Sequence, residues 1–161
     1  MEPMAFAMEH LRFRRVAALG LVFSVLAVPT TVIGREQPTL EELKGRVPNA
    51  SISDRPGLCI HISERQLDAA DRFYVAGDSE KAQAALADVV AFSELARDYS
   101  IQSHKHEKQS EIAIRKMARK LAGMKHTVSH DDQEQVQTAV DRLQLIRDDL
   151  LAAMFPKGVE K

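Results

Sequence analysis

Apolar residues recur at spacings of three and four from residue 56 to residue 155, with polar residues between them. This period is that of an α-helix with one buried face. No stretch alternates apolar and polar residues for long enough to predict a strand, and no proline stands between Gly57 and Phe155. The pattern predicts an all-α domain over residues 56–155.

Turn and cap residues divide this domain. Asp54-Arg55-Pro56 predicts the start of a first helix, with Asp54 as the N-cap and Pro56 in the first turn, and Gly77 ends this helix. A last helix begins near Ser129, because Asp132 three residues later makes a variant of the capping box. The apolar face of that last helix is formed by Val136, Val140, Leu143, Ile146 and Leu150.

The segment Leu67–Val90, LDAADRFYVAGDSEKAQAALADVV, resembles the helix pair of the tetratricopeptide family. The positions that fit are Ala70, Tyr74, Gly77, Asp78, Lys81, Ala82 and Ala85. No second copy follows at the 34-residue spacing of that family. The resemblance therefore implies a helical hairpin and no membership of the repeat family.

The middle of the domain, Asp78–Ala122, contains no helix breaker. As one helix it would be about 68 Å long. Its centre, SHKHEKQS at Ser103–Ser110, is wholly polar but lacks Gly, Pro, Asn and Asp. We therefore expect an antiparallel bundle of three helices, in which a long central helix packs against the first helix and then the last. The alternative is four short helices, with a break near Ser103.

The N-terminus has the pattern of an export signal. Three arginines precede the uncharged apolar run Val16–Val28, and small or branched residues lead up to Gly34. We expect residues 1–34 to be a signal peptide cleaved after Gly34, and the protein to be periplasmic or extracellular. The alternative is an uncleaved inner-membrane anchor over residues 16–33. Residues 35–55 are expected to be a linker, and residues 156–161 a C-terminal tail.

That linker contains one candidate for local structure. Thr39 to Lys44 has the composition of one or two helical turns, with Thr39 as the cap. Past Gly34 the chain carries 19 Lys and Arg against 21 Asp and Glu, a balance that argues against general nucleic-acid binding. The single cysteine, Cys59, excludes an internal disulfide. We expect its thiol to be buried, the alternative being an intermolecular disulfide.

Histidines supply the candidate metal ligands. His126 and His130 flank a predicted turn, with Asp131 beside them, and these three groups are a candidate zinc site. His104 and His106 are two residues apart, so on a helix they point in different directions and cannot share one ion. The aspartates are also what a helix N-terminus favours. We therefore expect surface residues here and no bound metal.

Positive charge is concentrated in residues 103–125, which hold seven Lys and Arg against two Glu. Four of these cations form the basic stripe: Arg115, Lys116, Arg119 and Lys120. In one interpretation the stripe packs beside the acidic last helix, whose Asp141, Asp148 and Asp149 offset it. In the other it binds an anionic lipid, polysaccharide or protein surface.

No motif of a nucleophilic, phosphate-binding or zinc-peptidase site occurs in the chain. We therefore expect no enzyme, no catalytic residues and no cofactor. The expected function is that of an exported helical protein of the cell envelope that binds a protein partner or its own copy. The alternatives are a metal-binding or stress-sensing envelope protein that uses histidines, and an anchor whose basic stripe binds an anionic envelope surface. The candidate apolar contacts are Leu95, Ile101, Ile112, Met117, Leu121 and Met124.

Overall fold

A computed structural model of the chain describes residues 38–156. This part of the chain is all-α, as predicted, and contains five α-helices, two 3₁₀ turns and no strand. The helices are α1 (Leu40–Arg46), α2 (Arg55–Val75), α3 (Ser79–Ser103), α4 (Glu107–Met124) and α5 (Gln133–Met154), and the 3₁₀ turns are Val47–Asn49 and His130–Asp132. The predicted signal peptide over 1–34, the alternative anchor over 16–33 and residues 157–161 of the tail lie outside the described residues.

The prediction of a long central helix is wrong. The segment is two helices, because α3 ends at Ser103 and α4 begins at Glu107. His104 and His106 adopt left-handed backbone conformations, with φ of 51° and 65°. Histidine enters this region more readily than most residues with a side chain, so it reverses the chain here without a glycine. The break lies where the alternative placed it, but the described helices number five rather than three or four.

The helix α2 and the helix α3 form an antiparallel hairpin around Gly77. Gly77 has a φ of 75°, which a glycine adopts without steric cost. Asp78 caps α3, because its carboxylate accepts the backbone N–H of Lys81 at 3.2 Å. The hairpin implied by the tetratricopeptide-like stretch is therefore present.

The helices α4 and α5 form a second hairpin, whose turn differs in detail from the prediction. Ser129 precedes a 3₁₀ turn and makes no side-chain cap bond. Its hydroxyl instead donates to the Asp132 carboxylate at 2.6 Å. The same carboxylate accepts Ser79 Oγ at 2.7 Å and Gln83 Nε2 at 3.0 Å. A buried carboxylate thus joins the start of α3 to the start of α5.

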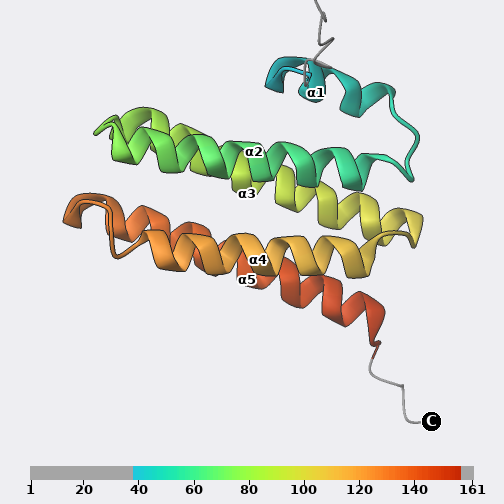
Figure 1. The fold of residues 1–161 in the computed structure, drawn as a ribbon. Coiled ribbons are helices and arrows are strands. Elements are labelled where there is room, and N and C mark those ends of the chain that lie inside the picture. Colours follow the sequence, from blue (N-terminus) through green and yellow to red (C-terminus); the bar gives the residue numbers. More distant parts are fainter. Residues whose placement is uncertain (1–37, 157–161) are drawn as a thin grey trace, which may run out of the picture. The chain divides into compact units, whose positions relative to one another are not determined.

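The two hairpins stack, with α3 along α5 and α2 along α4 (Figure 1). Gln83 contacts Asp132 near the start of α3 and α5, and Arg97 contacts Asp149 near their ends. The two helices therefore run parallel, from their starts to their ends. The main core lies between the hairpins and includes the whole predicted apolar face of α5: Val136, Val140, Leu143, Ile146 and Leu150.

The predicted turns after Thr39 form α1, and the cap is Thr39 itself. Its hydroxyl accepts the Glu42 backbone N–H at 3.2 Å, and the Glu42 carboxylate accepts the Thr39 backbone N–H at 2.8 Å. Residues 40–49 are more than a linker, because Leu43 and Val47 are buried against α2 and α3. This packing forms a second apolar cluster that includes Cys59, Ile62 and Ala96.

Candidate functional site

A groove of about 550 Å³ runs between α3 and α5. Its floor is apolar, because Leu86 and Ala139 are buried there and Val90 is half-buried. Polar side chains form the rim. The full lining is Gln83, Leu86, Ala87, Val90, Ala91, Glu94, Gln135, Thr138, Ala139 and Arg142. We call it the α3–α5 groove.

The groove exists because α3 presents alanine where a larger apolar residue would fill the space. Ala87 and Ala91 are four residues apart, so they lie on one face of the helix. Both are exposed. Leu95, four residues further on, continues the same face and is 36% exposed. A strip of small and apolar side chains is therefore open to solvent along α3.

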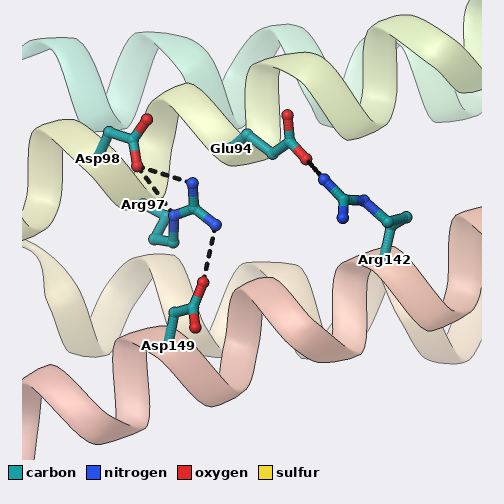
Figure 2. A network of polar contacts seen from close by, with 5 residues as sticks. All are labelled: Glu94, Arg97, Asp98, Arg142 and Asp149. Carbon is teal, nitrogen blue, oxygen red and sulfur yellow. Dashed lines mark hydrogen bonds and ion pairs between the residues drawn. The ribbon is translucent and has the colours of Figure 1, made fainter.

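Ion pairs link α3 and α5 at the end of the groove that lies toward the C-termini of both helices (Figure 2). The Arg142 guanidinium of α5 donates to the Glu94 carboxylate of α3. Arg97 Nη1 donates to Asp149 Oδ2 at 2.8 Å, while its Nε donates to Asp98 at 2.9 Å. These pairs fix the register of α3 against α5, and they leave a rim that carries both signs of charge.

An exposed leucine follows the last α5 residue of the groove lining. Leu145 is 55% exposed and follows Arg142 by three residues, which places it on the same face of α5. By helical spacing, Leu95 and Leu145 thus lie on the same helix faces as the groove residues Ala91 and Arg142. Ordinary surface leucines occur singly. Here two exposed leucines stand on the helix faces that line the groove.

The predicted apolar contacts divide into two groups. Met117, Leu121 and Met124 are buried in the main core, and Ile101 packs against it. These four are core residues of the described chain. Leu95 and Ile112 are 36% and 37% exposed. Leu95 follows the groove residue Ala91 by four residues on α3, whereas Ile112 lies on α4.

The candidate zinc ligands His126, His130 and Asp131 are all exposed. Within residues 38–156, no three His, Cys, Asp or Glu side chains converge in the geometry that a metal ion needs. His104 and His106 are also exposed, on the turn between α3 and α4. His104 Nδ1 lies 3.9 Å from the Glu107 carboxylate.

The basic stripe is split between two sides of α4. Lys116 and Lys120 line a shallow groove against α2, where Lys120 pairs with Asp68 at 2.6 Å. Arg115 and Arg119 line another groove, against α5. The carboxylates that pair with the stripe in residues 38–156 are Asp68 of α2 and Glu111 of α4.

In one of the two interpretations the aspartates of α5 offset the stripe, but in the structure they pair elsewhere. Asp149 accepts Arg97 of α3. Asp148 lies 3.8 Å from Arg147 on its own helix, and Asp141 accepts the Gln137 side chain. The charge distribution along the sequence therefore indicated that α4 packs beside α5, but it did not indicate which side chains pair.

Cys59 is fully buried, as predicted. Its thiol lies in the second apolar cluster, beneath α1. Burial raises the pKa of the thiol to about 11, which keeps it protonated at neutral pH. In the folded chain, this thiol is therefore a packing group.

Sequence reasoning named Leu95 but missed the α3–α5 groove. The available signal was the spacing of Ala87, Ala91 and Leu95, which marks a stripe on α3. What lies across from it depends on how the hairpins stack, and no local pattern specifies that. None of the helices in residues 38–156 is long and apolar enough to cross a membrane. No protein-family model, no curated protein and no solved structure matches this chain.

Proposed function

We propose that this protein is an exported, non-enzymatic helical protein that works by protein contact, and that the α3–α5 groove is its contact surface. The supporting observation is the groove itself, with an apolar floor, an exposed strip of alanines on α3 and a polar rim. Protein interfaces commonly have this arrangement of apolar centre and polar edge. Export rests on the arginine-led apolar run before Gly34.

The occupant that we propose is a second copy of the chain. The rim carries Glu94, Asp98 and Asp149 against Arg97 and Arg142. A surface with both signs of charge can face its own copy with acids opposite bases and little like-charge repulsion. Soluble oligomers most often pair identical patches across a two-fold axis.

The alanines favour close approach in such a pair. Ala87 and Ala91 would let the backbone of a second α3 come near without displacing side chains. Leu95 and Leu145, both exposed, would then be buried on dimer formation. Removing those leucines from water supplies the driving force, at about 25 cal/mol per Å² of apolar surface.

The test is the molar mass of the protein across concentrations, by sedimentation equilibrium. The protein is purified after expression of the full-length chain. Ala91→Glu places a carboxylate in the α3–α5 groove. Ala122→Glu, the matched control, places the same carboxylate at an exposed position of α4. Both positions lie inside helices and glutamate is a good helix former, so both variants should fold.

The proposal expects a monomer–dimer equilibrium for the unchanged protein and for Ala122→Glu, and a monomer for Ala91→Glu. A monomer in all three proteins would overturn self-association. Equal dimerisation of all three would overturn the groove as its site. If the protein is a monomer and binds a different protein through the surface around Ala91, the occupant of the groove is that protein and not a second copy.

A further inference from the structure

A second groove, of about 270 Å³, lies between α4 and α5 and is lined by three arginines. Its walls are Arg115, Ala118, Arg119, Ala122, Gln144 and Arg147. We call it the α4–α5 groove. Ala118 and Ala122 again leave room at the floor, four residues apart on α4. The groove therefore combines open space with a high density of guanidinium donors.

The three arginines come together only in the fold. Arg115 and Arg119 are one turn apart on α4, while Arg147 comes from α5. The basic stripe does not include Arg147. Conversely, the lysines of the stripe lie on the other side of α4, so they do not line this groove.

A buried carboxylate holds two of the guanidinium groups. Glu111 is 6% exposed, and Arg147 Nε donates to its Oε1 at 2.8 Å. Arg115 Nε lies 3.6 Å from the same oxygen. Both arginines thus face Glu111 through Nε. A guanidinium carries five N–H donors, so its terminal amino groups remain available for another acceptor.

The charge of the groove is not neutralised by its neighbours. Glu111 is shared by Arg115 and Arg147, and Asp148 lies 3.8 Å from Arg147. Within residues 38–156, Arg119 forms neither an ion pair nor a side-chain hydrogen bond, and it is exposed. Three guanidinium groups therefore face two carboxylates, and one of these carboxylates, Asp148, is 3.8 Å from the nearest guanidinium nitrogen. Excess positive charge faces the open space.

We propose that the α4–α5 groove binds an oxyanion of the phosphate type. Guanidinium groups bind phosphate through paired N–H donors, and they do so more strongly than neutral donors. Glu111 acts as a positioning residue, because it orients Arg115 and Arg147 and never touches the anion. Arg119 and the Gln144 amide supply the remaining donors. The site is separate from the α3–α5 groove and does not depend on self-association.

The first test titrates the purified protein with inorganic phosphate and follows the arginine side-chain resonances by NMR, with sodium chloride at matched ionic strength as the reference. Saturable shifts of the three arginines are expected. Arg119→Gln should weaken phosphate binding by about tenfold, since it removes a charge-assisted contact. Lys116→Gln removes the same charge from the other side of α4 and should change binding less than about twofold.

The glutamate variants supply an independent check. Ala122→Glu puts a carboxylate inside the α4–α5 groove and should abolish phosphate binding, whereas Ala91→Glu should leave it unchanged. The absence of saturable shifts would overturn the proposal. So would an equal loss in Lys116→Gln and Arg119→Gln, because that result indicates a diffuse charge effect.

A second arm distinguishes a lipid headgroup from a soluble phosphate. The protein is sedimented with vesicles of phosphatidylglycerol, and with phosphatidylcholine as control. Cosedimentation that Arg119→Gln abolishes and free phosphate competes assigns the site to headgroups. Phosphate binding without cosedimentation assigns it to a soluble phosphate. Both results support the site and differ only in the source of the anion.

Discussion

The hydroxyl oxygens of Ser100 on α3 and Ser110 on α4 lie 2.9 Å apart across the turn between the two helices. Both side chains are buried. Ser110 belongs to the polar stretch Ser103–Ser110, which was predicted to be the centre of a long helix. Ser100 lies just before that stretch. Once the chain reverses at His104 and His106, both serines face inward and satisfy each other.

This pair predicts a non-additive double-mutant cycle. Ser100→Ala leaves the Ser110 hydroxyl buried without its partner and should cost about 1–3 kcal/mol of unfolding free energy. Ser110→Ala should cost a similar amount. The double variant should cost less than the sum, because no unpaired hydroxyl remains. Urea unfolding measures all four proteins, and strict additivity would show that the two hydroxyls do not interact.

The backbone conformation of the turn predicts whether glycine at position 104 raises or lowers the stability of the fold. His104→Gly replaces a side chain at positive φ by the residue that adopts it without strain, and should stabilise the fold by about 1 kcal/mol. If residue 104 lay inside a continuous helix, the same substitution would instead lower the unfolding free energy by about 1 kcal/mol. Lys116→Gly, in the exposed middle of α4, is the control and should show that loss. Destabilisation by His104→Gly in urea unfolding would argue for an unbroken helix.

The break after Ser103 shows what helix propensity leaves open. The stretch Ser103–Ser110 contains no glycine, proline, asparagine or aspartate, so local rules favour a continuous helix. The burial of Ser100, Ser110 and Glu111 in tertiary contacts decides otherwise. By contrast, the ends at Gly77 and the cap at Asp78 were predictable, because one backbone angle and one side-chain bond account for them.

Asp132 predicts a loss of stability in acid. Hydrogen bonds from Ser129, from Ser79 and more weakly from Gln83 hold the pKa of this carboxyl below its ordinary value. A lowered folded-state pKa gives stability that is present above the unfolded pKa of about 4 and is lost as pH falls through the folded pKa. At pH 7, Asp132→Asn should cost about 1.5–3 kcal/mol.

The pH dependence provides the sharper comparison for this residue. Asp132→Asn should flatten the fall in the urea midpoint as the pH drops below the unfolded pKa of about 4, since the titrating group is gone. Asp131→Asn changes the exposed neighbour and should alter the neutral-pH stability far less. An unchanged acid slope in Asp132→Asn would mean that its carboxylate does not couple the starts of α3 and α5.

The packing of α1 predicts how fast Cys59 reacts. Leu43→Ala removes a buried contact of α1 and should cost about 2 kcal/mol or more. The looser α1 should speed alkylation of the Cys59 thiol by a maleimide. Leu145→Ala truncates an exposed leucine on α5 and should not speed it. Equal alkylation rates in Leu43→Ala and the unchanged protein would show that α1 does not shield the thiol.

The two grooves were harder to predict than the helices, for one shared reason. Ala87 and Ala91 of the first groove, and Arg115 and Arg119 of the second, stand at helical spacing and were visible in the sequence. Each groove also needs α5 opposite, and Arg147 had no sequence neighbour to suggest its role. The stacking of the hairpins depends on complementary packing across the core, which periodicity alone does not encode.

The most direct test of the central claim is crosslinking at the α3–α5 groove. Ala91→Cys is made in a Cys59→Ala background, Ala122→Cys is made in the same background, and both are treated with a short bismaleimide. If two copies meet at the groove, Ala91→Cys forms a covalent dimer and Ala122→Cys stays monomeric. Equal crosslinking at the two positions, or none at Ala91→Cys, would contradict the account.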